Sequence, residues 1–189
     1  MVKAVIFDCF GVLATDAWLP FKAKHFGRDQ KLTRQVSDIS NQADKGLVSR
    51  DAAIASIAEL AGISPTEFIR TIDINVPNEE LFDLIRTLKP DYKIGFLSNI
   101  SDDYLAQIFT PKHLSLFDAI TLSFKSGFIK PQTQAFERAA EQLDVKPAEC
   151  VMVDDQERNV TGAREAGMAA ILYRDFSQFK AEFESLVKV

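Results

Sequence analysis

Three acidic side chains in this sequence directly follow apolar runs. Asp8 comes after the run Ala4 to Phe7, and Asp154 and Asp155 follow a second run, residues 150–153. An apolar run without alternation is typical of a strand that is buried on both faces. Carboxylates at the ends of such strands could attack an electrophile or bind a divalent cation. These residues are therefore the first candidates for a functional site.

Polar and basic groups occupy similar places elsewhere in the chain. Residues 94–97 form a third apolar run that ends at Ser98 and Asn99, and Lys130 precedes Pro131 just past a further strand-like run. The carboxyl ends of parallel strands lie at one edge of a sheet, where ligands bind in α/β proteins. We therefore expect one pocket to contain Asp8, Ser98, Asn99, Lys130, Asp154 and Asp155.

Alternating strand and helix patterns predict the elements that position these side chains. Strands are expected near residues 4–7, 92–97, 119–122, 151 and 169–172. Helices are expected over residues 77–89, 102–109, 133–143, 158–166 and 177–187. Such alternation builds right-handed βαβ units. The predicted fold class is therefore α/β, a doubly wound parallel sheet with helices on both faces.

The stretch that follows the first strand has only helical patterns. Helices are expected near residues 16–26, 30–43, 49–61 and 65–72. The last of them begins at a capping box that is formed by Ser64 and Glu67. We predict an α/β core made of residues 1–14 and 77–189, with a helical insert at residues 15–76.

The four stretches around Asp8, Ser98, Lys130 and Asp154, in this order, resemble those of the haloacid dehalogenase superfamily of hydrolases, most of which are phosphatases. The similarity runs through the whole chain. It implies a Rossmann-like core in which the helical insert forms a small cap over the carboxyl edge of the sheet. It also implies that Asp8 is the catalytic nucleophile and that Lys130 stabilises charge beside it. Ser98, Asn99 and Lys130 would bind the transferred group.

The acidic residues also predict a metal site. Three carboxylates in one pocket repel one another, and a divalent cation offsets that repulsion. Oxygen ligands without histidine or cysteine favour Mg²⁺. The resemblance implies that Asp8 and Asp155 bind the ion directly, together with the main-chain carbonyl of Phe10. Asp154 would act through a water molecule.

Phe10 departs from the pattern of the phosphatases in this superfamily. Those enzymes have an aspartate at this position, which protonates the leaving group and then activates water. General acid–base catalysis contributes roughly 10²–10⁴ in rate, so alkyl phosphates should be poor substrates unless another group substitutes. We predict a magnesium-dependent hydrolase, a weak or unusual phosphatase that acts through an aspartyl-phosphate intermediate on a small phosphorylated metabolite.

Two alternatives are compatible with Phe10. The haloacid dehalogenases themselves carry an aromatic residue at this position, because halide leaves without protonation, so a metal-free 2-haloacid dehalogenase is one alternative. Those enzymes have small neutral residues in place of Asp154 and Asp155, so the acidic pair favours the phosphatase. The other alternative is a non-catalytic binding or regulatory protein that keeps the fold and the cation.

Composition limits the partners and the compartment. The chain has 189 residues, of which 47% are hydrophobic, and a net charge of −5 with a pI near 5.1. This charge attracts neither nucleic acid nor an anionic membrane, so the expected partner is a small molecule. Cys9 and Cys150 lie in apolar runs and are expected to be free thiols. We therefore expect a cytoplasmic protein, and a monomer by default.

Overall fold

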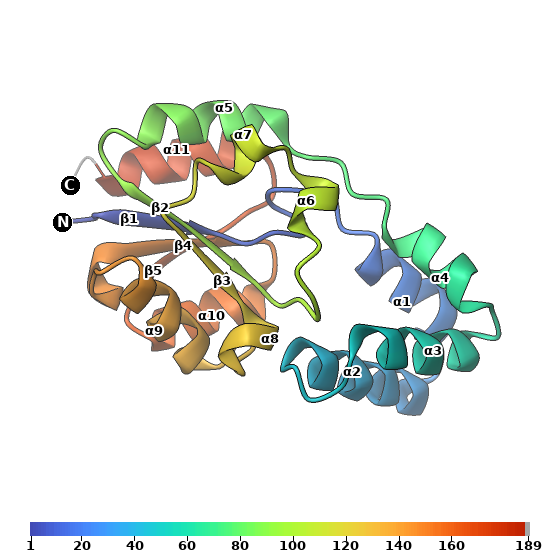
Figure 1. Cartoon of the computed structure of the whole chain (residues 1–189). Helices are drawn as coiled ribbons and strands as arrows, with labels where there is room; N and C mark the ends of the chain where they lie inside the picture. Colours follow the sequence, from blue (N-terminus) through green and yellow to red (C-terminus); the bar gives the residue numbers. More distant parts are fainter. Residues whose placement is uncertain (188–189) are drawn as a thin grey trace.

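The computed structural model describes residues 1–187 and contains a parallel sheet of five strands in the order β3-β2-β1-β4-β5 (Figure 1). The strands are β1 (Ala4–Phe7), β2 (Lys93–Ser98), β3 (Ala119–Leu122), β4 (Cys150–Asp154) and β5 (Ala169–Leu172). Helices cover both faces of this sheet, which confirms the predicted doubly wound α/β fold.

The central strand β1 is covered on both faces, as its uninterrupted apolar run predicts. Val5 and Phe7 belong to the apolar core on one side of the sheet, and Ala4 and Ile6 belong to the core on the other. All four side chains are fully buried. Because neighbouring residues of a strand point to opposite faces, such a strand has no polar side.

Two pairs of long helices form the layers on either side of the sheet (Figure 1). α5 (Glu79–Leu88) and α11 (Phe176–Val187) pack with Val5 and Phe7. α9 (Thr133–Gln142) and α10 (Glu157–Glu165) pack with Ala4 and Ile6. The remaining elements of the α/β part are short: α6 (Leu105–Ile108), α7 (Pro111–Leu114), α8 (Ser123–Ser126) and the 3-10 helix Pro147–Glu149.

Four helices between β1 and α5 lie together beside the carboxyl edge of the sheet (Figure 1). They are α1 (Trp18–Phe26), α2 (Gln30–Asp44), α3 (Arg50–Ala61) and α4 (Pro65–Ile72). We call residues 15–76 the helical segment. Its buried side chains, among them Phe26, Val36 and Phe68, form an apolar cluster separate from those of the sheet. Of the capping box predicted for α4, one half is present among the described residues: Ser64 Oγ accepts from Glu67 N over 3.2 Å, but the Glu67 side chain does not accept from Ser64 N.

The two linkers of the helical segment are hydrogen-bonded to each other. Thr15 N donates to Val76 O over 3.0 Å, and Val76 N donates to Thr15 Oγ1 over 2.9 Å. Just outside the segment, Asn78 N donates to Leu13 O over 2.9 Å. The chain therefore leaves the sheet and returns to it at one place.

One predicted helix is much shorter than expected. A helix was predicted over residues 102–109, directly after Ser98 and Asn99, but α6 contains only Leu105–Ile108. Ile100 N donates to Ser123 Oγ over 2.9 Å, and the same hydroxyl donates to Ile100 O over 3.1 Å. These bonds hold the chain in a loop beyond the end of β2, so the helix starts later.

Within residues 1–187, no single helix is both long enough and apolar enough to cross a bilayer. α3 and α4 reach that length and composition only as a pair, which is bent by 100° at the break between them. The apolar side chains of this pair, such as Ile57 and Phe68, are buried against the other helices of the segment.

Candidate active site

Four charged side chains meet at the carboxyl edge of the sheet. Asp8, Asp154 and Asp155 each offer a carboxylate oxygen, and these oxygens lie within 4.8 Å of one another. Lys130 Nζ lies 2.6 Å from Asp8 Oδ1 and 2.7 Å from Asp154 Oδ2. The side chains of Lys130, Asp8 and Asp154 are almost completely buried. Residues far apart in the sequence thus form one compact cluster.

The register of the sheet places the two strand-end acids beside each other. β1 pairs with β4 so that Phe7 lies opposite Val153, and Asp8 N donates to Val153 O over 2.9 Å. The loop after β1 then turns at Gly11, whose φ is +84°. A Cβ atom at this position would lie 2.4 Å from Asp155 Oδ2. Glycine is therefore required here for both the turn and the close approach of the carboxylate.

Asn99 holds the main chain of Lys130. Its Nδ2 donates to Lys130 O over 3.0 Å, and its Oδ1 accepts from Lys130 N over 2.8 Å. Both ends of the amide are thus engaged in orienting the lysine, a link that the sequence pattern did not reveal. Ser98 is fully buried at the end of β2. A direct contact of Ser98 or Asn99 with a transferred group stays a prediction.

The acidic cluster carries more negative than positive charge. Burial and the neighbouring Asp154 raise the pKa of the Asp8 carboxyl well above its usual range, and Lys130 offsets this only in part. Burial raises the pKa of Asp155 to about 6. Burial alone would lower the pKa of Lys130, but the charges of Asp154 and Asp8 raise it. An added cation would favour the ionised carboxylates, because it opposes their repulsion.

The oxygen atoms of the cluster fit a magnesium ion. Asp154 is fully engaged: its Oδ1 accepts from Gln156 N and Asn159 Nδ2, both over 2.9 Å, and its Oδ2 accepts from Lys130. By contrast, Asp155 Oδ1 is buried and has no hydrogen-bond partner in the part of the chain that the structure describes. An unpaired buried oxygen is destabilising unless a donor or a cation satisfies it. A hard cation that prefers oxygen ligands meets this requirement.

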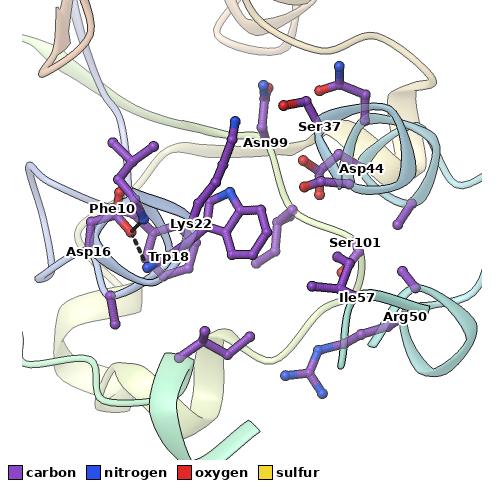
Figure 2. A pocket seen from close by; sticks show the side chains of 18 of the residues that line it. Phe10, Asp16, Trp18, Lys22, Ser37, Asp44, Arg50, Ile57, Asn99 and Ser101 are labelled. Atoms are coloured by element: carbon purple, nitrogen blue, oxygen red, sulfur yellow. Dashed lines mark hydrogen bonds between the residues drawn. The ribbon is translucent and has the colours of Figure 1, made fainter. Parts of the chain in front are cut away.

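A cavity of about 200 Å³ opens between this cluster and the helical segment. Asp8, Phe10, Asn99 and Lys130 line it on the side of the sheet. The helical segment contributes apolar side chains, among them Trp18, Ile54, Ile57 and Phe68, and about as many polar or charged ones, among them Lys22, Asn41, Asp44 and Arg50. Figure 2 shows Phe10, Asp16 and Trp18 at one side of the cavity and Asp44 and Arg50 across from them. Any molecule bound here would contact the sheet and the helical segment together.

The sequence profile of the haloacid dehalogenase-like hydrolases matches residues 2–167. This chain belongs to that family. The match covers most of the core and the whole helical segment, so the hydrolase has the family's sequence pattern as well as its fold.

Individual relatives agree with this assignment. The sesquiterpene phosphatase astK of Aspergillus oryzae is 28% identical to the hydrolase over 191 residues, covering 98% of this chain and 96% of the relative. A family enzyme of Bacteroides thetaiotaomicron, solved with magnesium and inorganic phosphate, superposes with a TM-score of 0.74 at 24% identity, over 95% of this chain and 99% of the other. The L-2-haloacid dehalogenase of Xanthobacter autotrophicus, solved with chloropropionic acid covalently bound, superposes with a TM-score of 0.67 at 20% identity, over 98% of this chain and 83% of the other. At these identities the two structures establish a shared fold.

Three acids of the helical segment line the cavity of the hydrolase without belonging to any motif. They are Asp16, which lies just before α1, Asp44, the last residue of α2, and Asp73, which directly follows α4. A carboxylate at the C-terminal end of a helix is unfavourable because the helix dipole is negative there. That misplaced charge is the one signal by which Asp44 could have been noticed.

Asp44 should make the stability of the hydrolase depend on pH. Burial raises the pKa of its carboxyl from 3.8 to about 7. Between these values the folded protein holds a proton that the unfolded chain releases, so the free energy of unfolding falls with rising pH by up to about 1.4 kcal/mol per unit. Asp44→Asn removes this contribution. We expect the variant to be more stable than the wild type at pH 8 and equally stable below pH 3.8.

Denaturant unfolding of both proteins across this pH range measures the effect. Asp38→Asn is the matched control, because Asp38 is an exposed residue of the same helix. The control should keep the wild-type dependence on pH. If the free energy of unfolding of Asp44→Asn fell with pH as steeply as that of the wild type, the Asp44 carboxyl would ionise as freely in the folded protein as in the unfolded chain.

Proposed function

We propose that the protein is a magnesium-dependent phosphatase that acts on a small phosphorylated molecule through an aspartyl-phosphate intermediate. The observation that carries this proposal is the cluster in which Lys130 lies between Asp8 and Asp154 while Asp155 Oδ1 has no partner among residues 1–187. A nucleophile with an excess of negative charge around it needs a cation before it can approach an anionic phosphate. A metal-free dehalogenase has no use for this excess.

The hydrogen bonds of Asp8 identify which of its oxygens would attack. Oδ1 accepts from Cys9 N and from Lys130 Nζ, each over 2.6 Å. Oδ2 has no protein donor in the described part of the chain, so its lone pair can approach phosphorus. Lys130 holds the carboxylate in position and offsets charge that develops on the phosphoryl oxygens. Magnesium, held by Asp8, Asp155 and the Phe10 carbonyl, would supply further positive charge beside the transferred group.

The apolar part of the cavity wall supports a substrate with an apolar body. The helical segment, which would act as a cap, presents Trp18, Ile54, Ile57 and Phe68 to the space beside Asp8. Burial of such side chains against an apolar ligand is favourable by about 25 cal/mol per Å². The relative named as a sesquiterpene phosphatase supports the same substrate class, a phosphorylated compound whose remaining part is apolar. Every side chain of this site comes from a single chain, so the proposal requires no second subunit.

Metal removal tests the proposed function directly. We expect purified protein to release phosphate from an activated aryl phosphate and from acetyl phosphate when Mg²⁺ is present. Excess chelator should lower the rate by about 100-fold or more, because a bound metal contributes several kcal/mol of charge stabilisation. Added Mg²⁺ should restore it.

Release of halide from 2-chloropropionate, measured beside these reactions, separates the alternatives. Halide release that chelator does not affect would make the protein a dehalogenase and overturn the proposal. A folded sample with neither activity would indicate the non-catalytic binding protein.

A further inference from the structure

The proposed phosphatase lacks a proton donor at the usual place. Phe10 lines the cavity next to the nucleophile, and its ring can neither protonate a leaving group nor activate water. The remaining carboxyl groups of the cavity wall are Asp16, Asp44 and Asp73. Asp73 forms an ion pair with Arg50, with both of its oxygens 3.2 Å from Arg50 Nη2. Both carboxylate oxygens of Asp73 are thus occupied by the guanidinium.

Of the other two acids, Asp16 follows the loop after β1 that carries Phe10. The chain just before Asp16 is hydrogen-bonded to that loop, since Ala14 N donates to Cys9 O over 2.9 Å and Ala14 O accepts from Gly11 N over 2.7 Å. Figure 2 shows Asp16 on the same side of the cavity as Phe10, with Asp44 across from it. Asp16 and the nucleophile Asp8 line the same cavity.

The hydrogen bonds of Asp16 fix its carboxyl and leave one oxygen open. Oδ1 accepts from Trp18 N over 2.7 Å and from Leu19 N over 3.3 Å, at the start of α1. Oδ2 has no hydrogen-bond partner among the residues that the structure describes, so it can carry a proton. Burial raises the pKa of this carboxyl above its ordinary value, despite the two main-chain donors. A raised pKa keeps the acid protonated closer to neutral pH, as a general acid requires.

We propose that Asp16 is the general acid and base of this active site and replaces the aspartate that Phe10 displaces. The inference rests on the proposed function. When Asp8 Oδ2 attacks phosphorus, the bond from phosphorus to the leaving oxygen breaks, and that oxygen takes the proton of Asp16. The Asp16 carboxylate then accepts a proton from water, whose oxygen attacks the aspartyl phosphate. The acyl phosphate P–O bond breaks, which restores Asp8 and releases phosphate, while Asp16 again holds a proton.

The variant Asp16→Asn tests this role through the leaving group. Asparagine caps a helix about as well as aspartate, so α1 should be retained. It cannot donate or accept the proton, so we expect hydrolysis of an alkyl phosphate to fall by roughly 10²–10⁴. An aryl phosphate such as 4-nitrophenyl phosphate has a leaving group that needs no proton. Attack of Asp8 on this substrate should slow much less, whereas loss of the base slows hydrolysis of the aspartyl phosphate formed from either substrate. The readout is therefore the ratio of the two losses in kcat/KM, which for each substrate reports the steps up to release of the leaving group.

Asp29→Asn is the matched control. Asp29 caps α2 in the same way, since Oδ1 accepts from Lys31 N over 2.8 Å and from Leu32 N over 3.1 Å, and it does not line the cavity. The control should change neither rate. A second variant restores the displaced acid: Phe10→Asp added to Asp16→Asn should recover alkyl phosphate hydrolysis. Recovery would show that the lost function is proton transfer rather than folding.

The outcomes separate this inference from the function on which it rests. Equal losses in kcat/KM on both substrates, or no loss on either, would make Asp16 a structural cap only. A wild type that cleaves aryl phosphates but not alkyl phosphates would also overturn the role of Asp16, and the metal-dependent phosphatase would stand. Absence of metal-dependent release from both substrates would overturn the phosphatase and this inference with it.

Discussion

Replacing Asp8 by asparagine should abolish turnover without destabilising the fold. The amide cannot form the aspartyl phosphate, and loss of a nucleophile typically lowers rates by at least about 10⁴-fold. The amide oxygen can still accept from Cys9 N and Lys130 Nζ. The substitution also removes one of three carboxylates that repel one another. We therefore expect the free energy of unfolding to stay the same or to rise.

Initial rates with aryl phosphate at saturating Mg²⁺ measure the first effect, and denaturant unfolding measures the second. Asp8→Ala cannot revert to the acid by deamidation, and it should lower the initial rate as much as Asp8→Asn does. A variant that retains most of the wild-type rate would show that Asp8 does not carry the phosphoryl group. A large loss of stability would mean that Asp8 acts mainly in folding.

Lys130→Met should cause the largest loss of stability of any substitution at the site. Lys130 is the only ammonium within 2.7 Å of Asp8 and Asp154 in the described chain, and all three side chains are buried. Removing one partner of a buried ion pair typically lowers the free energy of unfolding by about 3–5 kcal/mol, because a charge stays buried without compensation. Denaturant unfolding in the presence of chelator measures this, since chelator prevents a metal ion from replacing the lysine charge.

An ion pair on the surface provides the matched control. Lys125 Nζ lies 2.8 Å from Asp103 Oδ2, but the two side chains are 59% and 45% exposed. Lys125→Met should lower the free energy of unfolding by no more than about 1 kcal/mol. Adding Asp8→Asn to Lys130→Met should recover part of the lost stability, because it removes one uncompensated charge. Similar losses in the two lysine variants would show that the cluster does not depend on Lys130.

The arrangement of the sheet was predictable because its strands are apolar throughout. The sequence predicted β3 and β5 with their observed bounds, and β1 likewise. The short helices α7 and α8 were not predicted, because four residues make about one turn and show no apolar periodicity. The length of α6 was wrong for a different reason. Its start depends on the contact between Ile100 and Ser123, which local sequence does not report.

The site was predictable where residues stand at strand ends, and less so elsewhere. The meeting of Asp8 with Asp154 follows from the pairing of β1 with β4, which a parallel sheet requires. The two hydrogen bonds between the Asn99 side chain and the main chain of Lys130 depend on the loop after α8, and no spacing in the sequence reveals them. Asp16 is similar. Its importance follows from where the helical segment packs, a tertiary property that no motif records.

The paired linkers of the helical segment limit how the active site can open. Two separate tethers would allow the segment to slide, twist and tilt over the sheet. Thr15 and Val76 are hydrogen-bonded to each other, so the two linkers are fixed to each other where the segment joins the sheet, and a motion that separated them would break both bonds.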